Sequence, residues 1–252
     1  ALTGIVFAAD FFNIFVFLEV AAISSYALIG VAGGKALFAA FRYLILGTIG
    51  ASIYLLGVSY LYAVTGTLNM ADMADKLPFL LGSKALVGGL LFMFIGLGIK
   101  MALVPFHAWM PEAYAHAPES TSPILASLVT KIALLAWIRI IYWVLNASIV
   151  IFDIPALQLV AVLGASAAVI GASLALAQRN IKMMFAYGGI SHIGIILIGI
   201  GQGNQTGFVG GIFYLLNDAV MQAALFFIAG VAFCQYGVRT IDELGRIGKQ
   251  AP

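Results

Sequence analysis

The chain has very little charge and almost no cysteine. Aspartate, glutamate, lysine and arginine make up only 9% of its 252 residues, whereas an average soluble domain has about 25%. Cys234 is the only cysteine, so no internal disulfide can form, and we expect it to pack within an apolar helix. The net charge is +2, and no basic patch indicates a nucleic-acid partner. These shortages argue against a soluble domain and against a disulfide-stabilised one.

Long apolar runs fill most of the chain, which is 63% hydrophobic with a mean hydropathy of +1.10. A helix needs about 20 apolar residues to cross a hydrocarbon core of about 30 Å. The runs lack the alternation of a membrane-spanning strand. The sequence therefore predicts an all-α, polytopic transmembrane helical bundle that forms a single domain over residues 1–252. The seven predicted spans are 11–32, 36–65, 84–107, 120–145, 156–178, 181–201 and 207–236.

The connections between these runs carry turn chemistry. Gly33 and Gly34 follow the first span, and the 66–82 segment is the longest polar connection, with room for a short interfacial helix. Residues 1–7 resemble the end of an earlier helix, and the last residues lie in a predicted loop. We therefore expect this sequence to be an internal piece of a longer subunit.

Lysine and arginine gather at one end of the predicted bundle, which indicates the cytoplasmic side. The chain should therefore be an integral protein of a prokaryotic plasma membrane or its organellar equivalent. The basic end holds Lys35, Arg42, Arg179, Lys182, Arg239, Arg246 and Lys249. The opposite end holds Lys76 and Lys84, offset by Asp72, Asp75 and Asp153.

Five spans each carry one ionisable residue near mid-depth, namely Glu19, Lys100, Lys131, His192 and Asp218. A charge at the bilayer centre costs from about 3 to over 10 kcal/mol, so several at similar depth indicate a path for charge. Lysine suits a proton relay because burial readily removes its proton and a nearby carboxylate restores it, whereas arginine stays charged.

Each of these residues also has a structural interpretation. Glu19 and Lys100 can form a static ion pair, while Lys131 has fewer obvious partners. His192 can bond a backbone carbonyl, and Asp218 can make a packing hydrogen bond. A further cation, at position 139, lies about two turns beyond Lys131 and suits a structural or lipid-interface role.

Pro105 follows Lys100 closely and should break or distort that helix, since proline removes a backbone hydrogen bond. In a membrane such a break is tolerated where water or protein satisfies the freed group. We expect it to admit water from the cytoplasmic side next to His107. A metal site at His107 and His116 is disfavoured, because their spacing is not that of helical ligands and no cysteine or carboxylate frames them.

The chain carries a combination of motifs that runs over nearly its whole length. They are Lys100-x₄-Pro105-Phe106-His107-x-Trp109-x-Pro111-x-Ala113, Ala117-Pro118 with Lys131, Phe15-Val16-Phe17-Leu18-Glu19, and Gln178-Arg179-Asn180-Ile181-Lys182 followed by Ile190-Ser191-His192-Ile193-Gly194. This combination resembles the antiporter-like membrane subunits of respiratory complex I, of Mrp-type sodium/proton antiporters and of membrane-bound hydrogenases. The resemblance implies that Glu19 modulates Lys100 on a discontinuous helix and that Lys131 passes protons onward.

The chain departs from the family pattern in three places. Asp218 and Gln222 stand where the family often has histidine and lysine, and Gly188 and Gly189 stand where it often has serines. The family's second broken helix, with its outlet residue, is expected beyond this sequence.

We therefore predict a proton-translocating subunit of a redox-driven or Mrp-type complex, in which Glu19, Lys100, Lys131 and His192 relay protons. Asp218, Arg139, His107 and Pro105 are secondary candidates. A sodium/proton exchanger subunit and a non-transporting membrane scaffold are the alternatives. Other membrane subunits, protons, possible Na⁺ and lipid are the expected partners. No redox cofactor or nucleotide site is expected, and any quinone or hydride chemistry belongs to neighbouring subunits.

Overall fold

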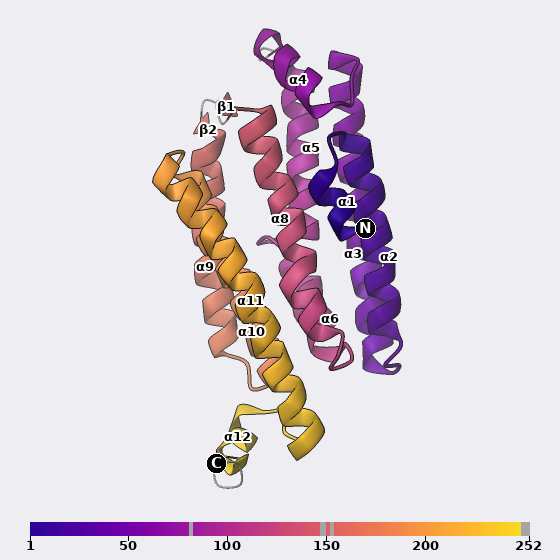
Figure 1. The fold of residues 1–252 in the computed structure, drawn as a ribbon, viewed down its shortest axis with the longest axis vertical. Coiled ribbons are helices and arrows are strands. Elements are labelled where there is room, and N and C mark those ends of the chain that lie inside the picture. Colours follow the sequence, from indigo (N-terminus) through magenta and orange to yellow (C-terminus); the bar gives the residue numbers. More distant parts are fainter. Residues whose placement is uncertain (81–82, 147–149, 152–153, 248–252) are drawn as a thin grey trace.

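The computed structural model describes residues 1–80, 83–146, 150–151 and 154–247, which form an elongated bundle of helices (Figure 1). The helices are α1 (Leu2–Phe7), α2 (Phe11–Gly30), α3 (Lys35–Thr65), α4 (Met70–Lys76), α5 (Lys84–Lys100), α6 (Met110–His116), α7 (Ser122–Ile124), α8 (Thr130–Arg139), α9 (Ala156–Leu176), α10 (Ile181–Gly201), α11 (Gln205–Tyr236) and α12 (Ile241–Ile247). Shorter elements are the 3₁₀ turns η1 (Leu77–Phe79) and η2 (Phe106–Trp109), the π-helical turns η3 (Leu125–Val129) and η4 (Ile140–Val144), and the paired strands β1 (Val150–Ile151) and β2 (Ile154–Pro155).

Six helices of the described part are long and apolar enough to cross a membrane, which confirms the predicted all-α transmembrane bundle. They are α2, α3, the continuous helix Ser122–Val144, α9, α10 and α11. The predicted seventh span, 84–107, is wrong in extent. Its helix, α5, has 17 residues and ends at Lys100.

A regular helix cap, rather than Pro105 itself, ends α5. The Leu103 N–H bonds the Gly98 carbonyl and the Ala102 N–H bonds the Ile99 carbonyl, which is the bonding pattern of a Schellman motif. Ala102 supplies the left-handed conformation of this motif with a φ of 56°. The predicted break after Lys100 is therefore confirmed. Pro105 follows it and prevents the chain from resuming the same helix.

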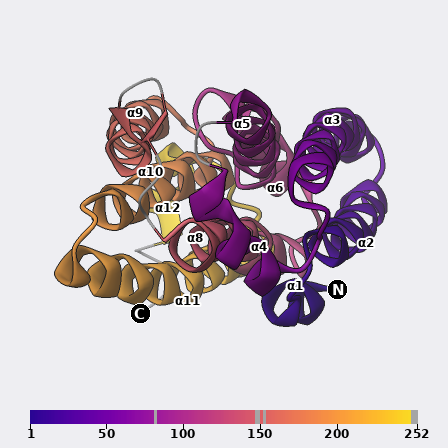
Figure 2. The same ribbon diagram turned by 90° about the horizontal axis from the view of Figure 1, so that it is seen from above.

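The bundle has two groups of helices with α8 between them (Figure 2). One group contains α2, α3 and α5, and the other contains α9, α10 and α11. Helices α9 and α10 approach closely, because glycines at their contact let the two backbones come together. A Cβ added to Gly164 would lie 2.8 Å from the Gly194 carbonyl oxygen, and one added to Gly171 would lie 2.5 Å from the Ser191 nitrogen.

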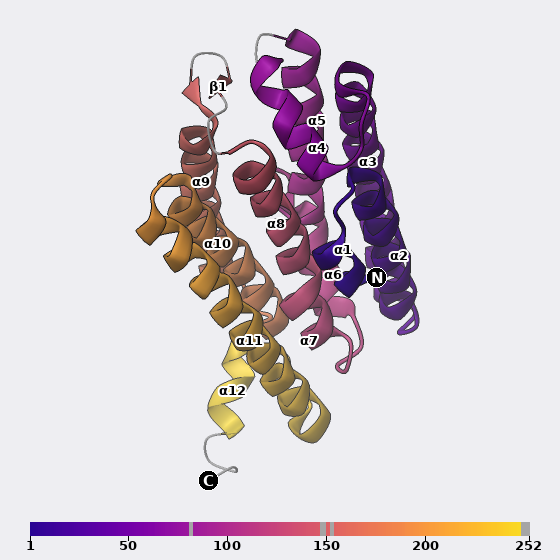
Figure 3. The same ribbon diagram turned by 45° about the horizontal axis from the view of Figure 1, so that its top comes forward.

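The two ends of the bundle differ in charge, as the sequence predicted. The α2–α3 turn, α6, the α9–α10 turn and α12 lie at one end, and α4 and the β1–β2 pair lie at the other (Figures 1 and 3). The interfacial helix expected within 66–82 is α4, which Asn69 caps by accepting from two backbone N–H groups. Asp153 and Lys249 lie outside the described residues, and the Arg246 side chain is likewise not described.

The packing role expected for Cys234 is wrong within this bundle, because its side chain is exposed. Helix α11 packs one face on α10 and on the Ser122–Val144 helix, and its opposite face, with Phe213, Val220 and Phe227, is uncovered. Cys234 lies on that uncovered part of the surface.

Candidate functional site

The five ionisable residues near mid-depth form two separate clusters. In the first, the Lys100 Nζ donates to Glu19 Oε1 at 2.7 Å and joins α5 to α2. Lys100 is the last residue of α5, where the carbonyl ends of the helix favour a cation. The Lys100 side chain is 5% exposed and that of Glu19 is 24% exposed. The expected pair therefore forms, and its carboxylate is the more accessible member.

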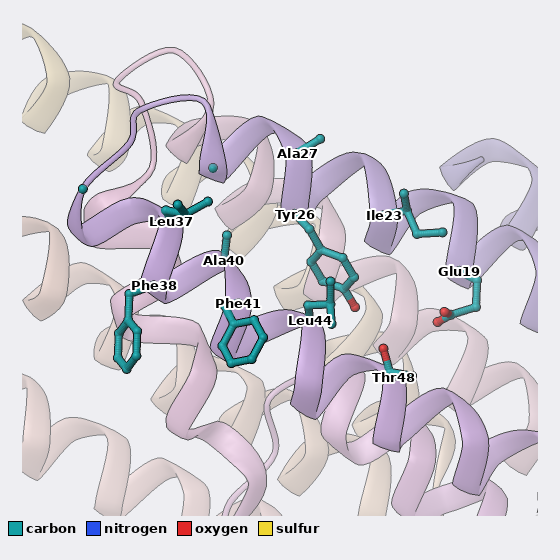
Figure 4. A pocket seen from close by; sticks show the side chains of 12 residues that line it. Glu19, Ile23, Tyr26, Ala27, Leu37, Phe38, Ala40, Phe41, Leu44 and Thr48 are labelled. Atoms are coloured by element: carbon teal, nitrogen blue, oxygen red, sulfur yellow. The ribbon is translucent and has the colours of Figure 1, made fainter.

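Glu19 lines a wide groove between α2 and α3. The groove encloses about 980 Å³ and is lined almost entirely by apolar side chains. Figure 4 shows Glu19 and Thr48 at one end of the groove and Leu37 and Phe38 at the other. A change in what occupies this groove would change the surroundings of Glu19 directly.

Asp218 is the centre of the second cluster and is completely buried on α11. Its Oδ2 lies 2.9 Å from the Lys131 Nζ and its Oδ1 lies 2.7 Å from the His192 Nδ1. Lys131, for which the sequence offered few obvious partners, has a carboxylate partner in the structure. Asp218, for which a packing hydrogen bond was the structural interpretation, contacts two ionisable side chains. One carboxylate thus serves two side chains that can each carry a proton.

A local widening of the helix shapes the surroundings of Lys131. The helix from Ser122 to Val144 contains the π-helical turn η3, which ends just before Lys131. The Lys131 Nζ also donates to the Ala126 carbonyl, five residues earlier, at 2.8 Å. Single π turns inside α-helices occur frequently at functional sites. This turn was not predictable from apolar periodicity, and it gives the lysine a second oxygen ligand.

An apolar layer separates the two clusters. A cavity of about 10 Å³ lies between Lys100 and the helix that carries Lys131, with Leu18, Val129 and Ala133 in its wall. That volume is close to the minimum of about 10–15 Å³ that one water requires. Proton movement between the clusters therefore needs added water or a rearrangement of this layer.

A row of aromatic rings crosses the bundle from the first cluster toward the second. Tyr26 meets Tyr43 edge to face, Tyr43 stacks on Trp109 at 3.9 Å, and Trp109 meets Tyr114, which meets Phe226. The Trp109 indole N–H also donates to the Ile99 carbonyl at 2.8 Å, next to Lys100. Trp109 therefore satisfies a backbone group at the end of α5 and ties the broken helix together.

The other secondary candidates lie away from the two clusters. The Arg139 guanidinium donates to the carbonyls of Ile5, Val6 and Ala8, so it caps the end of α1. His107 lies near the Tyr187 ring, with centroids 6.4 Å apart. Within the described residues no group of three or more His, Cys, Asp or Glu side chains could hold a metal ion.

One further ion pair with a buried lysine, which lies at the basic end, was not predicted from the sequence. Lys182 was counted only among the loop charges, yet it is 8% exposed and its Nζ lies 2.7 Å from Glu119 Oε2. The signal that could have found it is the position of Lys182 in the first turn of an apolar helix, two residues after the capping Asn180.

Comparison with known proteins identifies the family. Residues 8–252 match the family model described as NADH:quinone oxidoreductase/Mrp antiporter, transmembrane. The chain belongs to this NADH:quinone oxidoreductase/Mrp antiporter family. The resemblance seen in the motifs is thereby confirmed, and the chain is an integral membrane protein.

Relatives come from two kinds of complex within this family. The chain is 41% identical to NADH-quinone oxidoreductase subunit N of Desulforudis audaxviator, over all of the chain and 50% of the relative. It is 32% identical to a Na⁺/H⁺ antiporter subunit of Bacillus subtilis, over 99% of the chain and 50% of the relative. The chain thus spans about half the length of the curated relatives it matches.

Solved structures share the same fold. An archaeal membrane-bound sulfane sulfur reductase has a TM-score of 0.86 at 33% identity, covering 95% of this chain and 49% of the other. The Mrp complex from Dietzia sp. DQ12-45-1b also has a TM-score of 0.86, at 30% identity, covering 95% and 44%. Both structures are of multi-subunit membrane assemblies.

Gln222 stands where the family motif often has a lysine, and its environment is unusual. Its side chain is 2% exposed on α11, one turn from Asp218, and its Nε2 has no hydrogen-bond partner among the residues that the structure describes. A Cβ added to Gly189 would lie 3.2 Å from that nitrogen. The glycine at this family serine position therefore leaves room for the buried glutamine side chain.

Proposed function

We propose that this chain is the core of a proton-translocating, antiporter-like subunit in a multi-subunit membrane complex. The observation that carries the proposal is the single buried carboxylate, Asp218, shared by Lys131 and His192. A shared carboxylate cannot fully compensate two cations, so the protonation of one partner weakens its hold on the other. That competition is what a stepwise proton carrier requires.

In this scheme Lys131 holds a proton while Asp218 compensates its charge. Protonation of the His192 imidazole draws the Asp218 carboxylate toward the new cation. The Lys131 ammonium is then left in a buried site with less compensation, and it releases its proton. Arginine could not replace Lys131 in this step because it does not release its proton in proteins.

Glu19 and Lys100 would act as the input that controls this centre. Glu19 is the more exposed member of its pair and lines the groove between α2 and α3. A neighbouring subunit that changes the charge or hydration of this groove would shift the attraction between Glu19 and Lys100. We propose that protons are the transported ion and that redox cofactors, including any quinone, belong to partner subunits.

The test uses the full-length subunit in its native complex, reconstituted into liposomes that contain a pH-sensitive dye. Lys131→Ala and Lys100→Ala should each abolish coupled proton movement while the complex still assembles. Normal proton movement in a fully assembled Lys131→Ala complex would contradict the proton relay and would support a non-transporting membrane scaffold.

A sodium/proton exchanger is the second candidate, because the Bacillus subtilis relative is a Na⁺/H⁺ antiporter subunit. The same liposomes distinguish the two functions. A proton translocator moves protons equally well with potassium or choline in place of sodium. An exchanger stops when sodium is removed from both sides.

A further inference from the structure

A polar pocket opens at the basic end of the bundle, away from both clusters. It encloses about 290 Å³ between α3, α6, α10 and the end of α11. Lys35, His116 and Arg239 line it together with Glu119 and Lys182. Its walls therefore combine basic side chains with one carboxylate.

Lys182 and Glu119 form an ion pair in the wall of this pocket. The Lys182 Nζ donates to the Ala117 carbonyl at 3.1 Å and to the Ser122 Oγ at 3.0 Å, and it pairs with Glu119 at 2.7 Å. The Glu119 side chain is 26% exposed, so its carboxylate reaches the pocket while the lysine stays covered. The pair resembles Glu19 and Lys100 in having one accessible carboxylate and one buried ammonium.

Helices α10 and α11 lead from this pocket to the Asp218 cluster. Lys182 and His192 are ten residues apart on α10, which corresponds to about 15 Å. On α11, Gly230 packs beside Glu119, and Asp218 lies three turns away. The pocket and the cluster thus lie along one interface, about 15 Å apart.

A fully buried phenylalanine lies between the two polar regions. Phe226 of α11 meets Phe185 of α10 and Tyr114 of α6 edge to face, each with centroids 6.1 Å apart. It is two turns from Asp218 and one turn from Gly230 along the same helix. This ring forms an apolar barrier across the interface.

Unsatisfied polar groups lie on the inner side of that barrier. The Tyr114 hydroxyl, the Thr130 hydroxyl and the Gln222 amide nitrogen are all buried, and within the described part of the chain they lack a well-formed hydrogen bond. Tyr114 and Thr130 approach each other, and Asp218 lies near Tyr114. Buried polar groups without partners are commonly satisfied by ordered water. Three such groups next to Asp218 indicate a site that holds water.

We propose that this pocket is the proton entrance to Lys131, with Glu119 as the group that accepts the proton and Phe226 as the barrier behind it. This inference rests on the proposed function. A proton from pocket water binds the Glu119 carboxylate and breaks its ion pair with Lys182. The proton then leaves Glu119 and crosses on water past Phe226 to the neutral Lys131 amine, which becomes an ammonium, and Glu119 is again a carboxylate.

The first test measures proton uptake by the reconstituted full-length complex across a range of pH. Glu119→Gln should slow uptake by at least about tenfold at high pH, where protons are scarce, and much less at low pH. Glu119→Asp should restore most of the rate. The charged or titratable neighbours of Glu119 and Lys182 are Lys35, His116, Arg239 and Cys234, and they are unchanged in these variants.

Asp242→Asn is the matched control, since this carboxylate is at the same end but 75% exposed and outside the pocket. It should leave the pH profile unchanged. If Glu119→Gln slows proton uptake equally at every pH, or does not slow it, Glu119 is not the proton acceptor at the entrance. If Lys131→Ala abolishes proton transport and Glu119→Gln has no effect, only the proposed entrance is contradicted. If Lys131→Ala transports protons at the full rate, the proposed function itself is contradicted.

The second test weakens the barrier. Phe226→Leu, which keeps most of the packing, should raise the passive proton leak through the complex by about tenfold, and Phe226→Ala should raise it further. Adding Lys131→Ala should return the leak to its original value. A leak that stays unchanged in Phe226→Leu, or that persists without Lys131, would contradict the proposed path.

Discussion

Two mid-membrane ion pairs, built from the same kinds of residue, differ in how they are enclosed. The Glu19 side chain is 24% exposed and lines a wide groove, whereas the Asp218 side chain is fully buried between two partners. Glu19 has one described ion-pair partner, Lys100, whereas the Asp218 carboxylate contacts both Lys131 and His192. An accessible carboxylate suits a group that responds to a neighbouring subunit, and a sealed one suits a group that controls where a proton resides.

The difference also concerns the backbone. Lys100 ends α5 at a break that the Schellman motif and Trp109 stabilise. Lys131 lies within a continuous helix, just after a π-helical turn. The first pair is thus attached to the capped end of a helix, and the second is held within a continuous span. Four substitutions test this contrast.

Removing the buried carboxylate should have the largest effect. Asp218→Asn leaves the Lys131 ammonium buried without compensation, which typically costs about 3–5 kcal/mol. We expect a large loss of thermal stability in detergent together with loss of proton transport. Adding Lys131→Met to Asp218→Asn should recover stability without recovering transport. If the Asp218→Asn complex has the same melting temperature as the unmodified complex, Lys131 and Asp218 do not form a charged pair.

Removing the accessible carboxylate should have a smaller effect on stability. Glu19→Gln keeps a hydrogen-bond acceptor for Lys100 and leaves the groove largely unchanged, so we expect a loss of about 1.5–3 kcal/mol at most. Coupled transport should fall strongly, while passive proton exchange at Lys131 continues. A larger loss of stability than in Asp218→Asn would reverse the proposed contrast.

The broken helix should depend on the indole of Trp109. Trp109→Phe retains stacking on Tyr43 but leaves the Ile99 carbonyl without its donor. The expected loss is about 1–3 kcal/mol, measured by thermal unfolding. Phe92→Leu, a change at a ring on α5 away from the break, is the control. Equal melting temperatures for Trp109→Phe and the unmodified chain would show that the indole hydrogen bond is dispensable.

The smallest effect should come from Ala102, and it should be stabilising. Its φ of 56° is left-handed, a conformation that costs a non-glycine residue about 1–2 kcal/mol. Ala102→Gly should therefore raise stability by up to about 1 kcal/mol without altering the Glu19–Lys100 distance. A lower melting temperature for Ala102→Gly would argue that the cap differs from the one described.

Apolar run length predicted most of the fold, because a membrane leaves the backbone few options besides helices. The six confirmed spans begin and end within about two residues of the prediction, which is close for boundaries drawn from composition. The seventh predicted span, 84–107, was too long because the apolar run continues past the end of α5 at Lys100. Hydropathy therefore does not detect the helix cap at Ala102. The motif after Lys100 correctly indicated a break. The break was attributed to Pro105, whereas the cap formed by Ala102 and Leu103 ends the helix.

The candidate site was only partly predictable. The pairing of Glu19 with Lys100 came from charge and family resemblance, and the geometry of the two side chains agrees with it. The link between Lys131, His192 and Asp218 depends on how three helices are placed side by side, which one sequence does not specify. The same reason hid the Lys182–Glu119 pair, whose members are 63 residues apart and meet only at the bundle end.

Lys131→Arg tests the central proposal most directly, that Lys131 moves protons by exchanging charge compensation with Asp218 and His192. Arginine can preserve the ion pair with Asp218 but does not release its proton. In the reconstituted full-length complex, we expect Lys131→Arg to assemble while proton transport falls by at least about a hundredfold. Proton transport at the unmodified rate in an assembled Lys131→Arg complex would contradict the account.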